Sequence, residues 1–298
     1  YIHTMKKLYV FGKSSGEKPS SVLPVTAAKP ADSKAVALQI VPGDILLKPG
    51  DELKLSVNKI DQYGNVLEAD VKADFAKYIP PTAKVKTEMD AEFAKIRDIR
   101  AGSDAKASAG AWKGNDGTVS GIFRGRVLSA IPFAEDFESY KTVIDSKIDP
   151  GEKFAYPPLP WIGARFKWEV REVDGTKALR KTLDRVLFQR AMTFIGHPDL
   201  KNYTMQADVM TDGNRRIKSD VGLVNQRYLI VLKGNANQLE VNSNQERLKV
   251  SVPFPVKYKK WYTLKSRVDV DDKGTATVRA KVWPKGEKEP QAWTIEVP

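Results

Sequence analysis

The carboxylates that could carry out hydrolysis lie in two parts of the second half of the chain. Glu169, Glu172 and Asp174 are close together in sequence, whereas Asp208 and Glu240 lie on separate strand-like stretches. A glycoside hydrolase needs two carboxyl groups about 5 to 9.5 Å apart, one of them a general acid. The first group does not have the spacing of an E-x-D-x-x-E-like cluster on one strand. No catalytic pair can therefore be assigned, and we expect no enzyme activity from these residues.

Large aromatic side chains are the strongest indication of a ligand. A sugar ring can stack its apolar face on an exposed aromatic ring. The alternative is that the aromatic side chains fill the core between two sheets, as large aromatic residues usually do. Trp161 lies in a loop flanked by prolines, so we expect it to be the most exposed of them. The candidate ligand-binding residues are Trp161, Trp168, Tyr228, Trp261 and Trp283.

A calcium ion is the one cofactor that the residues suggest. Asp269, Asp271 and Asp272 precede Gly274 and concentrate carboxylate oxygens, the ligands that calcium prefers, near one turn. The simpler explanation is that Asp and Gly are the residues that hairpin turns require. Both interpretations remain open from the sequence.

Other chemistry is limited by what the chain lacks. It contains no cysteine, which excludes disulfides, zinc–thiolate sites and cysteine nucleophiles. Its two histidines, His3 and His197, are far apart in sequence, so a histidine-rich metal site is excluded and a Ser-His-Asp triad is not expected. No apolar run approaches the 18 residues or so of a membrane-spanning helix.

The first half of the chain predicts an interrupted β-sandwich. Residues 1–13 predict two short strands, and the Pro-, Ser- and Lys-rich residues 14–35 predict an extended linker. Residues 36–132 show strand-like alternation, most clearly at Leu53, Leu55 and Val57. Within them, Glu88–Arg100 predicts a helix, because its apolar residues recur at helical spacing.

The second half predicts a larger antiparallel sandwich. Strand-like runs recur every 10 to 15 residues or so over 133–298, and several end in Asp-Gly or Lys-Gly hairpin signals. Tyr262, Leu264 and Val268 alternate with polar residues, as expected for a half-buried strand. Many strands with almost no helix predict a two-sheet sandwich or jelly roll.

Several sequence stretches resemble a known bacterial architecture. Asp136-Phe137-Glu138, Tyr203–Asp208, Gly222–Tyr228, Lys260–Lys265 and Val278–Trp283 together resemble a concanavalin A-like (laminin-G-like) jelly roll. They look most like the C-terminal region of PQQ-binding-like β-propeller repeat proteins of planctomycetes and related bacteria.

In that family an Ig-like sandwich precedes the jelly roll, and the stretch VPGDILLKPGDELKLSVNKIDQYGN looks like its opening strands. The resemblance implies that 1–13 are the last strands of a propeller, 36–132 an Ig-like sandwich and 133–298 a concanavalin A-like jelly roll. It also implies export to the periplasm or cell surface. No residue for binding PQQ can be carried over, because the resemblance covers no more of the propeller than its end.

The net charge of the chain bears on which partners it can bind. The chain has a formal net charge of +12, and from Gly151 onward it has 27 Lys and Arg residues against 17 Asp and Glu. The basic residues are dispersed and carry no nucleic-acid-binding motif, so we do not expect nucleic acid as a partner. We expect a non-catalytic binding or assembly region that contacts a glycan or an acidic surface, and its own propeller. The alternatives are a glycoside-active jelly roll similar to 3-keto-disaccharide hydrolases, a structural scaffold, or an accessory region of a quinone-dependent oxidoreductase.

Overall fold

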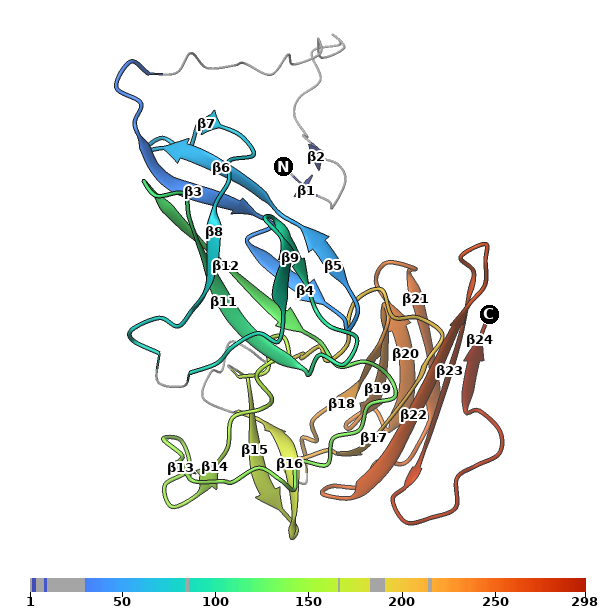
Figure 1. Cartoon of the computed structure of the whole chain (residues 1–298). Coiled ribbons are helices and arrows are strands. Elements are labelled where there is room, and N and C mark those ends of the chain that lie inside the picture. The colour runs from blue at the N-terminus through green and yellow to red at the C-terminus, as the bar shows by residue number, and fades with distance from the viewer. Residues whose placement is uncertain are drawn as a thin grey trace, which may run out of the picture.

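The chain folds into strands, turns and loops. The computed structural model describes Ile2–His3, Leu8–Tyr9 and residues 30–83, 86–165, 167–182, 191–213 and 216–298. These residues contain no helix, and so none that could cross a membrane, which confirms the predicted all-β class. Figure 1 shows a first sandwich in blue to green, two short hairpins in yellow-green and a second sandwich in orange to red.

The N-terminal strands form a hairpin. β1 (Ile2–His3) and β2 (Leu8–Tyr9) pair antiparallel, in agreement with the two short strands predicted over 1–13. Their assignment to a propeller stays a prediction. Most of the predicted linker over 14–35 lies outside the described residues, and β3 begins at its last residue, Ala35.

The first sandwich is built from three small sheets around one core. The strand orders are β3-β6-β7, β4-β12-β11-β8 and β5-β10-β9, and β4 runs parallel to β12 while the other pairs are antiparallel. Phe123, Ile99 and Val57 are fully buried in the common core. The strands are β3 (Ala35–Val41), β4 (Asp44–Leu47), β5 (Glu52–Lys54), β6 (Ser56–Asp61), β7 (Val66–Glu68), β8 (Asp74–Tyr78), β9 (Glu92–Lys95), β10 (Asp98–Arg100), β11 (Ser108–Asn115) and β12 (Ser120–Val127).

The helix predicted over Glu88–Arg100 is wrong. The segment forms the hairpin β9–β10, in which Phe93 and Ile99 are cross-strand partners. Both side chains pack on the core, whereas Ile96 at the turn is 58% exposed. A spacing of three fits a helix, but it also fits one apolar residue on each strand with a third at the turn. Burial decides between the two, because the hairpin places Phe93 and Ile99 on one face and that face packs on the core.

Two hairpins connect the sandwiches. β13 (Ile144–Asp145) pairs with β14 (Lys153–Phe154), and β15 (Trp168–Val173) pairs with β16 (Thr176–Lys181). The antiparallel bridge Ala155–Val170 ties the two hairpins together. We refer to residues 133–182 as the hairpin module.

The second sandwich contains two four-stranded antiparallel sheets. Their strand orders are β17-β22-β23-β24 and β18-β19-β20-β21. Tyr262 and Leu264 from the first sheet and Ile230 and Leu239 from the second meet in a core from which water is excluded. The strands are β17 (Thr204–Met210), β18 (Val221–Asn225), β19 (Tyr228–Lys233), β20 (Gln238–Ser243), β21 (Leu248–Pro253), β22 (Trp261–Val270), β23 (Ala276–Pro284) and β24 (Ile295–Val297).

Candidate binding surface

The outer face of the β17-β22-β23-β24 sheet carries polar and aromatic side chains in register. Because Tyr262 and Leu264 point into the core, Thr263 and Lys265, which alternate with them, point outward. Cross-strand pairing places Thr263 beside Trp283 of β23 and Lys265 beside Lys281. The alternation predicted for this strand is confirmed, and it explains why one face collects these groups.

A strap lies across part of this face. We define the strap as residues 285–294, which connect β23 to β24. The two carboxylate oxygens of Glu289 accept hydrogen bonds from the ammonium group of Lys265, at 2.9 and 3.1 Å, and Glu289 forms an ion pair with Lys281 at 2.7 Å. The ammonium of Lys281 also donates to the Pro290 carbonyl and lies 4.8 Å from the Trp293 ring centroid. These contacts explain why Lys281, on an outer face, is only 5% exposed.

We expect the strap to loosen in acid. Hydrogen bonds from Lys281 and Lys265 lower the pKa of Glu289 below its ordinary value of 4.5, against a smaller opposing effect of burial. A lowered folded-state pKa stabilises the attached strap above pH 4.5, and this contribution is lost as the pH falls through the lowered pKa. The difference in fluorescence between the chain and its Trp293→Phe variant should therefore change with a midpoint below pH 4.5. Glu289→Gln should remove that transition, and its persistence in the variant would contradict the assignment to Glu289.

A ladder of alternating charges occupies the end of the face beyond the strap. Asp269 receives two bonds from Arg267, at 2.9 and 2.6 Å, and one from Arg279 at 2.7 Å. Arg279 also pairs with Glu296 of β24. The pKa of Asp269 lies below its ordinary value of 3.8, mainly because Arg267 donates a hydrogen bond to the carboxylate. This carboxylate is therefore ionised and fully engaged by guanidinium groups.

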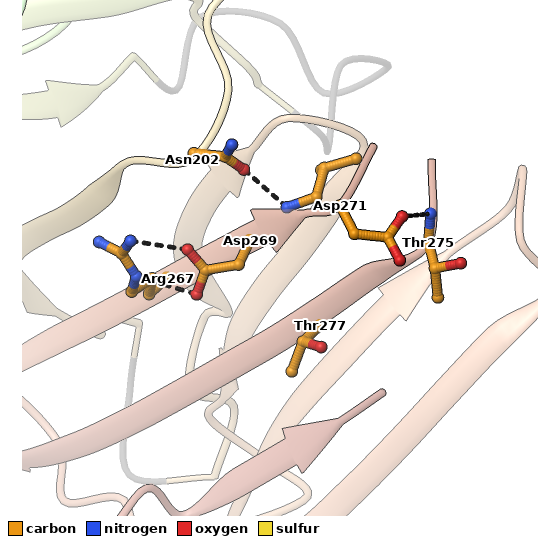
Figure 2. Close-up of a pocket in the computed structure, with 7 residues that line it drawn as sticks. Asn202, Arg267, Asp269, Asp271, Thr275 and Thr277 are labelled. Carbon is orange, nitrogen blue, oxygen red and sulfur yellow. Dashed lines mark hydrogen bonds and ion pairs between the residues drawn. The ribbon is translucent and has the colours of Figure 1, made fainter. Parts of the chain in front are cut away.

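The predicted calcium residues do not gather around one point. Asp269 and Asp271 line an open depression of about 400 Å³ together with Asn202 and Thr277, shown in Figure 2. The carboxylate of Asp271 accepts the backbone N–H groups of Lys273 and Thr275, so it closes the turn as the simpler explanation requires. Asp272 is exposed beside it. Among the described residues no group of three or more acidic or histidine side chains could hold a metal ion.

The opposite end of β22 forms a basic rim. We define the basic rim as Lys257, Tyr258, Lys259, Trp261 and Lys285. Tyr258 is 39% exposed, and Trp261 is half-buried with the Lys285 ammonium 5.5 Å from its ring centroid. Lys285 pairs with Asp208 at 2.9 Å.

The other two cations of the rim have no counter-charge in the part of the chain that the structure describes. Lys257 and Lys259 are exposed, and neither forms an ion pair with a carboxylate of the described residues. The ammonium of Lys259 lies instead 5.5 Å from the Tyr258 ring centroid. The rim therefore combines accessible aromatic faces with positive charge that nothing in the described chain neutralises.

Three of the predicted aromatic ligands are buried. Trp161, Tyr228 and Trp283 are 7%, 6% and 7% exposed. The expectation that Trp161 is the most exposed aromatic is wrong, because Phe133 and Phe137 pack edge-on against its ring at 6.4 and 5.7 Å. The flanking prolines predict a loop, but this loop folds so that nearby aromatic side chains cover Trp161.

The remaining two predicted aromatics are partly accessible. Trp261 belongs to the basic rim, and Trp168 begins β15 in the hairpin module. The Trp168 indole N–H is buried without a hydrogen-bond partner. The five residues therefore do not form one site: two lie in the hairpin module, two on the outer face of the β22 sheet and one in the core.

The carboxylates considered for hydrolysis are not paired. Asp208 lies on the outer face of β17 and Glu240 on the outer face of β20, in opposite sheets. Packed sheets are about 10 Å apart and both side chains point away from the core, so the carboxyl groups exceed the separation that hydrolysis needs. Arg171 donates a hydrogen bond to Glu169 at 2.7 Å. Glu172, the residue after Arg171, is exposed.

The sequence prediction missed Glu289 and Lys281, which hold the strap, and Arg171, which joins the two hairpins of the hairpin module. Period-two alternation along β23 could have placed Lys281 on the face of Trp283. Nothing in the sequence indicates that Glu289 returns across the sheet to meet it.

Comparison with known proteins gives no family assignment. No protein-family model and no curated protein matches the chain. Among solved structures, a DUF4784 family protein from Bacteroides caccae matches over 87% of this chain and 72% of its own, with 14% identity and a TM-score of 0.16. A score this low carries no argument about fold or function.

Proposed function

We propose that the chain is a non-catalytic binding or assembly region, and that its basic rim contacts a glycan or an acidic surface. The observation that carries the proposal is the combination of Tyr258 and Trp261 with Lys257 and Lys259, which have no ion-pair partner among the described residues. Aromatic faces stack on sugar rings, and lysine side chains at the edge attract anionic groups.

The scaffold suits a binding role. The rim is held by backbone hydrogen bonds from Lys259 to the Thr211 carbonyl and from Lys285 to the Trp261 carbonyl, at 3.1 and 3.0 Å. A rigid sandwich can present such loops without changing its core. The division into Ig-like and concanavalin A-like domains, the attachment to a propeller and the export of the protein are parts of this proposal that rest on the sequence resemblance.

The rim predicts binding to an acidic polysaccharide. The full chain should be retained on immobilised polygalacturonate in 0.5 M salt as well as at low salt. Trp261→Ala should weaken retention about 5- to 10-fold, since one stacking contact contributes about 1 kcal/mol. Lys257→Gln with Lys259→Gln should weaken it mainly at low salt, because exposed charges are screened at high salt.

A matched charge control is available at the other end of β22. Lys201 and Lys273 are also exposed and have no ion pair among the described residues, so their double glutamine variant has the same net charge as the rim variant. Equal loss of retention in both variants would show a general charge effect. No retention at any salt concentration would remove the glycan proposal and favour a structural scaffold.

A further inference from the structure

The hairpin module contains a guanidinium group that has no counter-charge among the described residues. Arg165 follows Ala164, whose carbonyl accepts hydrogen bonds from the backbone N–H groups of Lys167 and Trp168 at 3.0 and 2.9 Å. These two bonds close a turn that contains Arg165. The side chain is half-buried, and its Nε–H is fully buried with no hydrogen-bond partner. No carboxylate of the described residues forms an ion pair with it. Burying an N–H donor of a charged group without a partner is costly, so we expect a group outside the described residues to meet it.

Aromatic rings surround this cation. The guanidinium carbon lies 5.3 Å from the Tyr156 ring centroid, and Tyr156 is 44% exposed. Tyr140 lies close enough to Arg165 to affect its pKa, which burial lowers. Tyr140 in turn contacts Phe137, whose ring packs on Trp161.

The aromatic residues near Arg165 include a second exposed ring. Phe133 packs edge-on against Trp161 and is 42% exposed. Glu135, an acidic residue beside these rings, accepts a hydrogen bond from the Phe137 N–H at 2.8 Å and interacts with Tyr140. It does not neutralise Arg165. The unpaired Trp168 indole N–H, three residues beyond Arg165, is a second buried donor in this turn.

We propose that Arg165 binds an oxyanion, a carboxylate or a sulfate, carried by an acidic sugar that stacks on Tyr156. The guanidinium group presents a planar fork of N–H donors that matches both oxyanions. The exposed ring beside the cation favours a sugar over an acidic peptide, because a flat saccharide face can use the ring and a flexible carboxylate side chain cannot. The site is separate in sequence and structure from the basic rim and does not depend on it.

Small probes test the site on the full chain. Trigalacturonate supplies carboxylates, a sulfated chondroitin disaccharide supplies a sulfate, maltotriose is the neutral control and triglutamate is the peptide control. Binding is measured by calorimetry and by tryptophan fluorescence, since Trp161 and Trp168 lie in the module. Arg165→Gln should weaken binding of at least one acidic sugar about 10- to 100-fold, the usual range for a charge-assisted hydrogen bond. Tyr156→Ala should weaken it less.

Matched variants separate this site from its neighbours. Arg180→Gln, in β16 of the same module and half-exposed, should leave binding unchanged. The rim variant Lys257→Gln with Lys259→Gln should also leave it unchanged, so that failure of the rim proposal and failure of this one are distinguishable.

Stability provides a readout that does not need a ligand. Arg165→Met keeps most of the side-chain volume and removes the desolvated charge, so Tm should stay the same or rise by about 2–4 °C. A lower Tm together with no binding of either acidic sugar would overturn the proposal and make Arg165 a structural residue. Triglutamate binding that equals or exceeds sugar binding, and that is lost in Arg165→Gln, would overturn the sugar as the ligand.

Discussion

Replacing Arg171 by alanine is expected to lower the free energy of unfolding by about 3–5 kcal/mol. The guanidinium group is 4% exposed and joins the two hairpins of the module. Its Nε–H donates to Glu169 at 2.7 Å, one Nη group donates to Asp149 at 2.7 Å and the other donates to Ser146 at 2.8 Å. Without Arg171, the carboxylate of Glu169 would be buried with no positive partner.

The measurement is urea denaturation followed by tryptophan fluorescence. Arg180→Ala is the matched control, because Arg180 contacts Glu152 at 3.7 Å from the partly exposed side of the same module. A surface pair of that kind contributes about 0–1 kcal/mol. If Arg171→Ala cost no more than Arg180→Ala, the buried network would not hold the hairpins together.

Replacing Gly121 by alanine is expected to destabilise the first sandwich by about 2–3 kcal/mol, or more if the backbone must move. A Cβ atom at Gly121 would lie 2.1 Å from the Leu38 carbonyl oxygen, so β3 and β12 would have to separate. Gly121 pairs with Gly114 across the β11–β12 ladder, and Gly110 pairs with Gly125 in the same way. At these four positions the sheet lacks side chains because other backbone, at Gly110 and Gly121, or packed side chains, at Gly114 and Gly125, approach it closely.

The control substitution is Gly43→Ala. A Cβ atom there would lie at an ordinary 3.6 Å from the Ile40 carbonyl oxygen, and the position has no positive φ. It should leave the unfolding midpoint nearly unchanged, or raise it slightly through the unfolded state. Equal effects of Gly121→Ala and Gly43→Ala would mean that the close approach at Gly121 can relax without cost.

The same glycines show where reading the sequence by itself failed. Glycine inside a strand pattern suggests a break, so the sequence pattern around Gly121 and Gly125 indicates two short strands. In the structure β12 (Ser120–Val127) is continuous through both. Close approach of the β3 backbone requires Gly121, and the packed side chains of Ile45 and Met89 require Gly125. No local sequence pattern indicates these contacts.

The binding surface was predictable only in part. Alternation along β22 correctly placed Tyr262 in the core and Trp261 outside it. The sequence could not show that Trp161 would be covered by Phe133 and Phe137, because those contacts depend on how a loop folds back. It also gave no sign that Arg165, an ordinary surface residue by type, would lie beside aromatic rings and form no ion pair with the described residues.

The sequence by itself determined the all-β class, the two sandwich regions and the inward or outward direction of side chains along the clearest strands. These properties follow from period-two alternation and turn residues, which are local. Only the tertiary structure decided that Glu88–Arg100 is a hairpin, that Asp208 and Glu240 lie on opposite faces, and that Lys257, Lys259 and Arg165 have no ion-pair partner within the described chain. Each of these depends on contacts between residues far apart in sequence, and burial and charge pairing determine which of those contacts form.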